Sequence, residues 1–148
     1  MNAEGTFVFV YGTLKAGDYN NHLLMQNGAG FISNGLTPAI FDMVNLGGYP
    51  ALITGHNEIV GEVWSVDEEC LKVLDSLEVP YGYIRTTEKV TDLRTGTIYE
   101  CTVYVATKKR ELELKDAIKR SKLEIIDSGH WPVDREATIE KNEQENQA

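Results

Sequence analysis

An apolar strand breaks at a glycine in FVYGTLKAG, residues 9–17, where polar residues take over. A glycine directly after a strand lets the chain turn sharply and can bring backbone N–H groups to one side, because no Cβ is in the way. Such a turn would bind a carboxylate or a developing oxyanion, with Thr13 adding a hydroxyl donor. On these residues alone, an ordinary turn that ends the strand is the simpler interpretation.

Apolar runs on either side of this turn predict further strands, since they alternate or continue over several residues and are bounded by turn residues. The predicted strands span residues 6–11, 36–44, 49–53, 59–66, 83–90 and 98–106. Gly96 lies between the last two runs, which is typical of a hairpin. We therefore expect residues 83–90 to pair with residues 98–106.

Helices are predicted in three segments. In residues 67–77 the apolar side chains are three and four positions apart on one face, and Asp67 fits the N-cap position. Residues 108–121 contain good helix formers with a weak apolar stripe, which is typical of a surface helix, and residues 21–27 predict a shorter one. Because strands outnumber helices, we expect an α+β fold with a small mixed, barrel-like β-sheet flanked by a few helices.

Composition predicts one domain and an acidic tail. The chain has 148 residues, of which 42% are hydrophobic, enough for a single core, which we assign to residues 1–133. Residues 134–148 carry five acidic and two basic side chains with little to bury, and we expect this tail to be disordered. No apolar window is long enough for a membrane span and no signal peptide is evident, so we expect a cytoplasmic protein.

A net charge of -9 disfavours nucleic acid and anionic membranes as partners. No apolar stripe is left over for an interface, so we expect a monomer. The histidines His22, His56 and His130 are scattered, and no metal site is predicted. Cys70 and Cys101 are expected to be reduced, buried thiols rather than nucleophiles. The aromatic side chains of Tyr81, Tyr83, Tyr99 and Tyr104 are interpreted as strand packing.

Glu78 ends the apolar face of the helix predicted at residues 67–77, near the negative end of the helix dipole. Burial and the dipole both disfavour the charged form and should raise its pKa from about 4.3 toward neutrality. A carboxyl of that kind can accept and donate a proton near pH 7. A solvated glutamate is the alternative, and Arg85 likewise could pair with a substrate carboxylate or with a structural partner.

Several blocks, taken in order, resemble the γ-glutamylcyclotransferase superfamily, and in particular its γ-glutamylamine cyclotransferase branch, which includes AIG2-like proteins. The blocks are YGTLKAG at 11–17, NH at 21–22, GYPAL at 48–52, VGEVW at 60–64, LDSLE at 74–78 and YIR at 83–85. The resemblance runs from about residue 6 to residue 131, and its specificity lies in the order and spacing of the blocks.

The resemblance implies a γ-glutamylcyclotransferase-like barrel, no cofactor, and a small-molecule γ-glutamyl substrate. The implied reaction is cyclisation of a γ-glutamyl-amine, or a related γ-glutamyl conjugate, to 5-oxoproline with release of the free amine. Glu78 is the implied general base and acid. The implied substrate-binding residues are Tyr11, Gly12, Thr13 and Leu14, which cradle the γ-glutamyl group, together with Tyr83 and Arg85.

One departure and two alternatives stand beside this interpretation. The family often has Ser-Gly-Asp-Trp near its C-terminal end, whereas this chain has His130 in the third position of Ser-Gly-His-Trp. A protein of a different class would keep the cradle without catalysis and bind a small γ-glutamyl or amino-acid ligand. A third possibility keeps the enzyme but changes the substrate to glutathione, a γ-glutamyl dipeptide or a γ-glutamyl-protected biosynthetic intermediate, because the cradle reads only the shared γ-glutamyl end.

Overall fold

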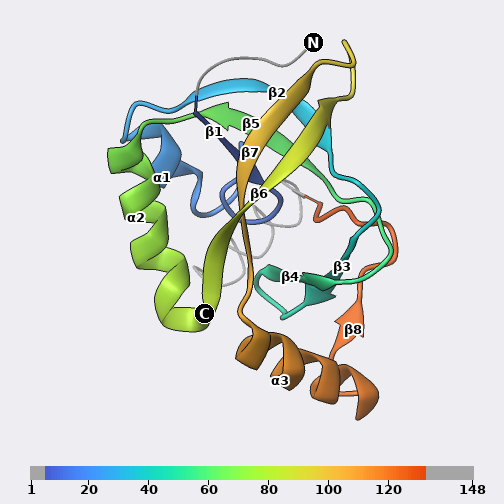
Figure 1. Ribbon diagram of the computed structural model, residues 1–148. Coiled ribbons are helices and arrows are strands. Elements are labelled where there is room, and N and C mark those ends of the chain that lie inside the picture. Colours follow the sequence, from blue (N-terminus) through green and yellow to red (C-terminus); the bar gives the residue numbers. More distant parts are fainter. Residues whose placement is uncertain (1–5, 133–148) are drawn as a thin grey trace, which may run out of the picture.

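Five strands close into a barrel in the computed structural model, which describes residues 6–132 (Figure 1). The strands are β1 (Phe7–Val10), β2 (Gly30–Leu36), β5 (Val60–Ser65), β6 (Tyr83–Asp92) and β7 (Ile98–Ala106). Around the barrel their order is β1-β5-β2-β6-β7. The sheet is mixed, because β1 runs antiparallel to β5 and parallel to β7. The prediction of a small mixed barrel is confirmed.

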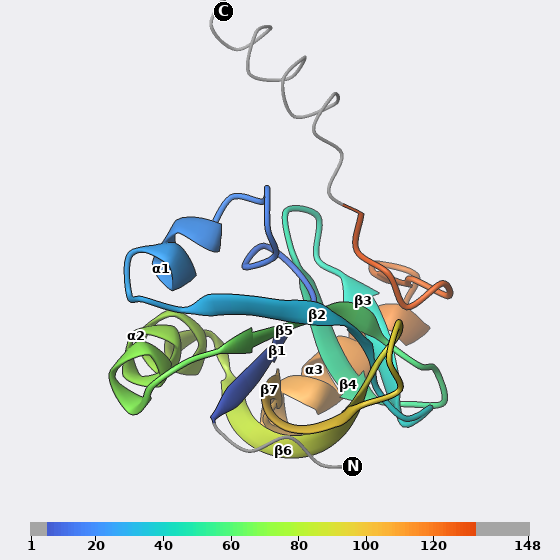
Figure 2. The same ribbon diagram turned by 90° about the horizontal axis from the view of Figure 1, so that it is seen from above.

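A second sheet lies beside the barrel and has the order β4-β3-β8. Its strands are β3 (Phe41–Asn45), β4 (Pro50–Thr54) and β8 (Glu124–Ile125). Figures 1 and 2 show the helices α1 (Asn21–Met25) and α2 (Glu68–Glu78) on one side of the barrel, and α3 (Lys108–Lys119) beside the second sheet.

The β6–β7 hairpin forms as the sequence predicts. Its register runs from Tyr83 opposite Ala106 to Thr91 opposite Ile98. Asp92 closes the turn, since its Oδ1 accepts hydrogen bonds from the backbone N–H groups of Arg94 at 2.8 Å and Thr95 at 3.2 Å. These strands form the longest stretch of pairing in the barrel and carry two of the tyrosines that matter below.

The strand predicted at residues 36–44 is wrong as a single element. Leu36 ends β2 in the barrel, and Phe41 begins β3 in the second sheet. Between them Pro38 has no N–H to donate, and Thr37 turns aside to pair with Ile59 through its backbone N–H and its side-chain hydroxyl. Most of β2, which is largely exposed and contains two glycines, and the two-residue β8 were not predicted from the sequence.

The helix α2 begins at the predicted N-cap and packs along the barrel. The Oδ1 of Asp67 accepts a hydrogen bond from the backbone N–H of Cys70 at 2.8 Å. Cys70, Leu71 and Leu74 are buried against barrel residues that include Trp64. The helix continues into a 3-10 turn, η1 (Val79–Tyr81), and Gly82 ends it in the left-handed conformation at φ 93°. This short connection joins the last residue of α2 to the first residue of β6.

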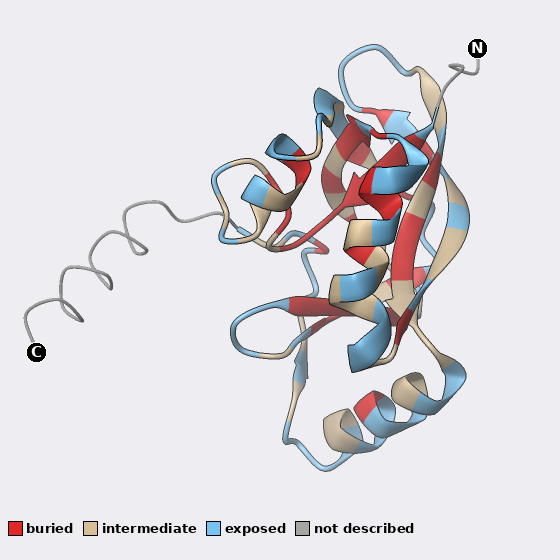
Figure 3. Cartoon of the chain, turned by 90° about the vertical axis from the view of Figure 1, so that its left-hand side faces the viewer, coloured by how far each residue is buried: buried red, intermediate tan, exposed pale blue. Residues whose placement is uncertain are grey.

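Buried residues lie mainly in the strands, and exposed residues lie mainly in the loops and on the outer sides of the helices (Figure 3). The helix α3 buries only Leu114 of its residues, which confirms a surface helix, and α1 ends at Met25, two residues before the predicted end.

Cys70 and Cys101 are both free thiols and both buried, as predicted. Within residues 6–132 no helix is both long and apolar enough to cross a membrane. The predicted tail at residues 134–148 and the domain boundary at residue 133 lie outside the described residues.

Candidate active site

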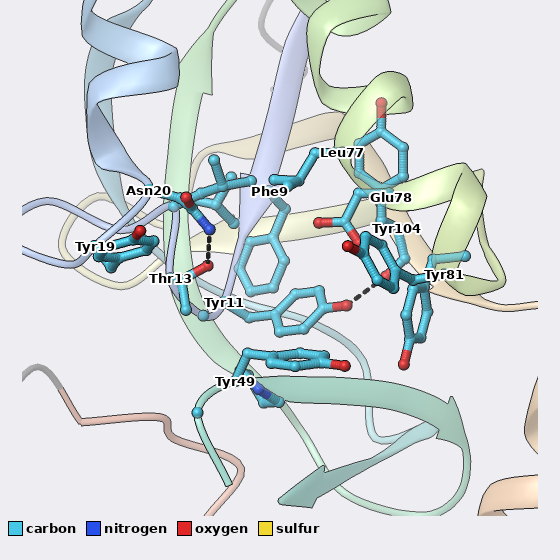
Figure 4. A pocket seen from close by; sticks show the side chains of 16 residues that line it. Phe9, Tyr11, Thr13, Tyr19, Asn20, Tyr49, Leu77, Glu78, Tyr81 and Tyr104 are labelled. Atoms are coloured by element: carbon cyan, nitrogen blue, oxygen red, sulfur yellow. Dashed lines mark hydrogen bonds between the residues drawn. The ribbon is translucent and has the colours of Figure 1, made fainter. Parts of the chain in front are cut away.

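A cavity of about 370 Å³ opens at the end of β1, next to the last turn of α2 (Figure 4). The loop after β1 forms one wall, the end of α2 and η1 form another, and the β3–β4 turn forms a third. The lining residues are Phe9, Val10, Tyr11, Gly12, Thr13, Leu14, Tyr19, Asn20, Gly48, Tyr49, Pro50, Leu77, Glu78, Tyr81, Tyr83 and Tyr104. Most of the sequence-predicted site residues thus meet in one place.

The loop after β1, which lines this cavity, is a tight turn with unused backbone donors. The backbone N–H of Lys15 donates to the carbonyl of Gly12 at 3.1 Å, which closes a tight turn. The side chain of Thr13 is fixed by Asn20, whose Nδ2 donates to the Thr13 hydroxyl oxygen at 2.9 Å. Among the described residues, the N–H groups of Gly12, Thr13 and Leu14 have no hydrogen-bond acceptor. They are available for a negatively charged oxygen.

Glu78 is the last residue of α2, and Figure 4 shows its carboxyl extending into the cavity toward Tyr11. Burial raises the pKa of this carboxyl from 4.5 to about 7. Within the described chain, no residue donates a hydrogen bond to the carboxylate or forms an ion pair with it. A carboxyl in this state is divided between its acid and base forms at neutral pH, so it can both take up and return a proton.

Three buried tyrosines form the floor around Glu78. The Tyr11 hydroxyl donates to the backbone carbonyl of Tyr104 at 2.6 Å. The pKa of Tyr11 lies well above its ordinary value of 10. Burial is the main cause, and the negative charge of Glu78 is the second. Burial is also the main cause that raises the pKa of Tyr83, whose hydroxyl receives a 3.5 Å hydrogen bond from Arg110 of α3. These phenols are therefore neutral near pH 7 and act as hydrogen-bonding groups.

Arg85 is the one predicted site residue that does not line the cavity. Its side chain turns to α2, where Nε lies 2.8 Å from Asp75 Oδ1 and Nη2 lies 2.6 Å from Asp75 Oδ2. Its remaining nitrogen, Nη1, lies 3.0 Å from Glu68 Oε1. Of the two interpretations that the sequence left open, the structure shows the pairing with structural partners.

Three exposed tyrosines form an aromatic mouth of the cavity that was not predicted from the sequence. Tyr19, Tyr81 and Tyr49 are 82%, 65% and 40% exposed, yet all three line it. The interpretation of Tyr81 as strand packing is wrong, because η1 precedes the strand and leaves the ring at the surface. Available signals were the position of Tyr81 three residues after Glu78 and the glycines that precede Tyr49.

No three His, Cys, Asp or Glu side chains in residues 6–132 gather in a way that could hold a metal ion. The chemistry available to the cavity is therefore built from one carboxyl, neutral phenols and backbone donors. That set suits proton transfer and oxyanion stabilisation at an acyl carbon.

The same fold occurs in the crystal structure of an AIG2-like protein from Mus musculus. The two align with a TM-score of 0.66 and 31% identity, over 76% of this chain and 84% of that one. This likeness defines the class of the fold, a γ-glutamyl cyclotransferase-like barrel.

The family follows from the sequence itself. A family model described as gamma-glutamyl cyclotransferase, AIG2-like, matches residues 8–133. A Vibrio cholerae protein assigned to the γ-glutamylcyclotransferases is 37% identical over 125 residues, which are 84% of this chain and 93% of that protein. The γ-glutamylaminecyclotransferase of Mus musculus is 34% identical, over 66% of this chain and 75% of that enzyme. The chain belongs to the γ-glutamyl cyclotransferase, AIG2-like family, and this membership indicates a γ-glutamyl cyclotransferase enzyme.

Proposed function

We propose that the protein cyclises a γ-glutamyl-amine to 5-oxoproline and releases the free amine, with Glu78 as general base and then general acid. The observation that carries the proposal is the meeting of the Glu78 carboxyl, with a pKa of about 7, and the free N–H groups of the 11–14 loop in one cavity. Glu78 supplies the proton transfers, and the loop supplies the cradle for the γ-glutamyl group.

The reaction needs no protein nucleophile. The α-amino nitrogen of the substrate attacks its own γ-carbonyl carbon, a five-membered ring forms, and the bond from that carbon to the leaving nitrogen breaks. Ionised Glu78 takes one proton from the α-ammonium group and passes it to the leaving nitrogen. The ring nitrogen loses a second proton as the lactam forms, and Glu78 passes this proton to the same amine, which leaves as an ammonium ion. The cavity contributes further by holding the substrate in the folded conformation that brings the two reacting atoms together.

The 11–14 loop is suited to the oxygen of the γ-carbonyl. That oxygen becomes negatively charged when the ring closes, and fixed backbone donors stabilise such a charge without having to reorganise. The loop is held in place by the bonds of its own carbonyl groups, since the Thr13 carbonyl accepts from the backbone N–H of Asn20 at 2.8 Å and the Leu14 carbonyl accepts from Asn21 Nδ2 at 2.9 Å.

The charge of the cavity supports an amine as the leaving group. Its lining contains no lysine, arginine or histidine, and Glu78 is its one carboxyl. A dipeptide or glutathione would bring a further carboxylate into this wall without a cation to receive it, and next to Glu78 that carboxylate would be repelled. An amine brings an apolar or cationic chain, which the tyrosine rings at the mouth accommodate.

The experiment that tests this proposal measures 5-oxoproline release from γ-glutamyl-amines, γ-glutamyl dipeptides and glutathione. We expect turnover with the amines, and a fall in kcat on the order of a hundredfold to ten-thousandfold in Glu78→Gln. Glu69→Gln is the matched control, because Glu69 lies on the same helix and is exposed. Binding of a γ-glutamyl-amine without turnover of any substrate would overturn the proposal in favour of a non-catalytic binding protein. Turnover confined to dipeptides or glutathione would keep the class of reaction and overturn the choice of leaving group.

A further inference from the structure

Arg85 and Tyr104 are register partners in the β6–β7 hairpin. Paired residues of neighbouring strands project from the same face of a sheet, so both side chains reach the helix that covers this face, α2. They converge there on a single carboxylate, that of Asp75. Asp75 lies in α2 three residues before Glu78, and residues three apart are neighbours on a helix surface.

The bond from Arg85 to Asp75 is bidentate, with N–O distances of 2.8 and 2.6 Å. Paired donors of this kind fix orientation as well as distance. The hydrogen bonds from Arg85 are the main cause that lowers the pKa of Asp75, and the carboxylate therefore stays ionised at neutral pH. A charged, two-point contact thus holds the middle of α2 against the hairpin.

Tyr104 extends this contact to the floor of the cavity. Its hydroxyl lies 2.6 Å from Asp75 Oδ1 and 3.2 Å from the carbonyl of Leu71. The hydroxyl has one proton, so the shorter bond to the charged oxygen is the one that it makes. The backbone carbonyl of Tyr104 in turn receives the hydroxyl of Tyr11 at 2.6 Å, as Figure 4 shows. Arg85 is therefore linked to Tyr11 through Asp75 and Tyr104, since Tyr104 bonds Asp75 with its hydroxyl and Tyr11 with its backbone carbonyl.

We infer that Arg85 is a positioning residue, which fixes where Glu78 enters the cavity by clamping Asp75 of α2 to the β6–β7 hairpin. Glu78 depends on its helix for this placement, because its own carboxylate receives no hydrogen bond from a described residue. Arg85 does not reach the cavity, so a role in binding the substrate carboxylate is not open to it in this arrangement. The kinetic form of this inference rests on the proposed function.

Steady-state kinetics distinguish positioning from substrate contact. In Arg85→Met we expect kcat to fall by about tenfold to a hundredfold, because a displacement of about 1 Å at the reacting group is enough for that loss. We expect KM to change by less than about twofold. Arg85→Lys, which keeps the charge and loses the two-point contact, should recover part of the loss. Lys72→Met is the matched control, since it removes another ion pair of α2 that lies at the surface. A KM raised by tenfold or more with kcat unchanged would overturn the inference, because it would mark Arg85 as a substrate contact.

A second readout does not depend on activity. The pKa of the Glu78 carboxyl can be followed by carbon NMR in the wild-type chain and in Arg85→Met. We expect it to move from about 7 toward its ordinary value of 4.5 when the clamp is lost and the carboxyl reaches water. A pKa that stays at about 7 would overturn the inference, whatever happens to the melting temperature. If Arg85→Met does not fold, Asp75→Asn supplies the same comparison with a smaller change of shape. A wild-type chain that lacks turnover but shows the shift would defeat the proposed function and leave the positioning role standing.

Discussion

The ring of Pro50 packs directly against Gly12. A Cβ atom at position 12 would lie 2.7 Å from Pro50 Cδ and 2.8 Å from Pro50 Cγ, closer than real Cβ atoms approach their neighbours. The backbone of Gly12 is not in the left-handed conformation, so contact with the β3–β4 turn, and not a positive φ, is what requires glycine here. The same contact joins the 11–14 loop to the β3–β4 turn that carries Tyr49.

Gly12→Ala should therefore damage both the loop and the turn. We expect the free energy of unfolding to fall by about 1–3 kcal/mol, as in other overpacked sites, and KM for the γ-glutamyl substrate to rise as the loop moves. Urea denaturation and steady-state kinetics measure the two effects. Gly30→Ala is the control, because a Cβ there meets no atom within 4 Å. Equal stability and KM for Gly12→Ala and wild type would contradict the packing argument.

The pKa of Glu78 predicts the pH dependence of activity. As a base it must be ionised to accept the proton of the α-ammonium group, so kcat/KM should rise with pH and level off above about pH 7. The bound ammonium group favours the ionised carboxylate, and the corresponding rise in kcat should lie at a lower pH than that in kcat/KM. Initial rates measured over a series of pH values check the rise in kcat/KM and the rise in kcat. A rise centred near pH 4.5 in kcat/KM would contradict the burial of this carboxyl.

The same shift predicts that Glu78 costs stability at neutral pH. The pKa of Glu78 is raised from 4.5 to about 7 in the folded protein, because burial favours the neutral carboxyl. The contribution of neutral Glu78 to the free energy of unfolding is therefore fully present below pH 4.5 and is lost as the pH rises through 7. The shift corresponds to a loss of about 3 kcal/mol above pH 7. Glu78→Gln should therefore be more stable than wild type at pH 8 by up to this amount, with the difference shrinking by pH 4.5. Urea denaturation at the two pH values checks this, and an equal difference at both would contradict it.

The sequence predicted the hairpin and the helix α2 because each is determined by local residues. The hairpin at residues 83–106 has alternating strands around Gly96, and α2 has its N-cap and apolar face within one segment. The position of Glu78 at the end of this apolar face was also visible in sequence, but a solvated glutamate stayed open there, and its role as base and acid came from the family resemblance. The break between β2 and β3 was missed because it depends on Ile59, which is distant in sequence. The Ile59 carbonyl accepts a hydrogen bond from the Thr37 backbone N–H, and the Ile59 N–H donates one to the Thr37 hydroxyl oxygen.

Cavity residues could be predicted from the sequence where they belong to a recognisable motif. They could not be predicted where they come from segments that only the fold brings together. Tyr49 and Tyr81 reach the mouth from the β3–β4 turn and from η1, and the local signals, the glycines before Tyr49 and the closeness of Tyr81 to Glu78, do not show that the two segments meet. Arg85 was open to two interpretations because the motif places it near Glu78 in sequence, whereas strand alternation decides which face it takes. Tertiary pairing with Asp75 resolves that choice.

Lys15 and His130 line a second pocket, and Lys15 directly follows the 11–14 loop. Lys15 is 4% exposed, and its ammonium group donates to the backbone carbonyl of Trp131. Burial lowers the pKa of Lys15, and both burial and the charge of Lys15 lower the pKa of His130. Within residues 6–132 no carboxylate lies within 4.0 Å of the Lys15 ammonium group, although Glu62 lines the pocket with it. Position 130 is thus the place where an acidic side chain would reach a buried cation.

His130→Asp should stabilise the fold through this cation, and His130→Asn separates the charge effect from loss of the histidine ring. Relative to His130→Asn, we expect His130→Asp to raise the free energy of unfolding by up to about 1 kcal/mol at pH 7, since position 130 is exposed and solvent weakens the pair. The gain requires an ionised aspartate, so it should be present at pH 7 and lost below about pH 4. Denaturant unfolding of both variants at pH 7 and pH 3 measures it. Equal stability of the two variants at pH 7 would show that the Lys15 ammonium group does not interact with a carboxylate at position 130.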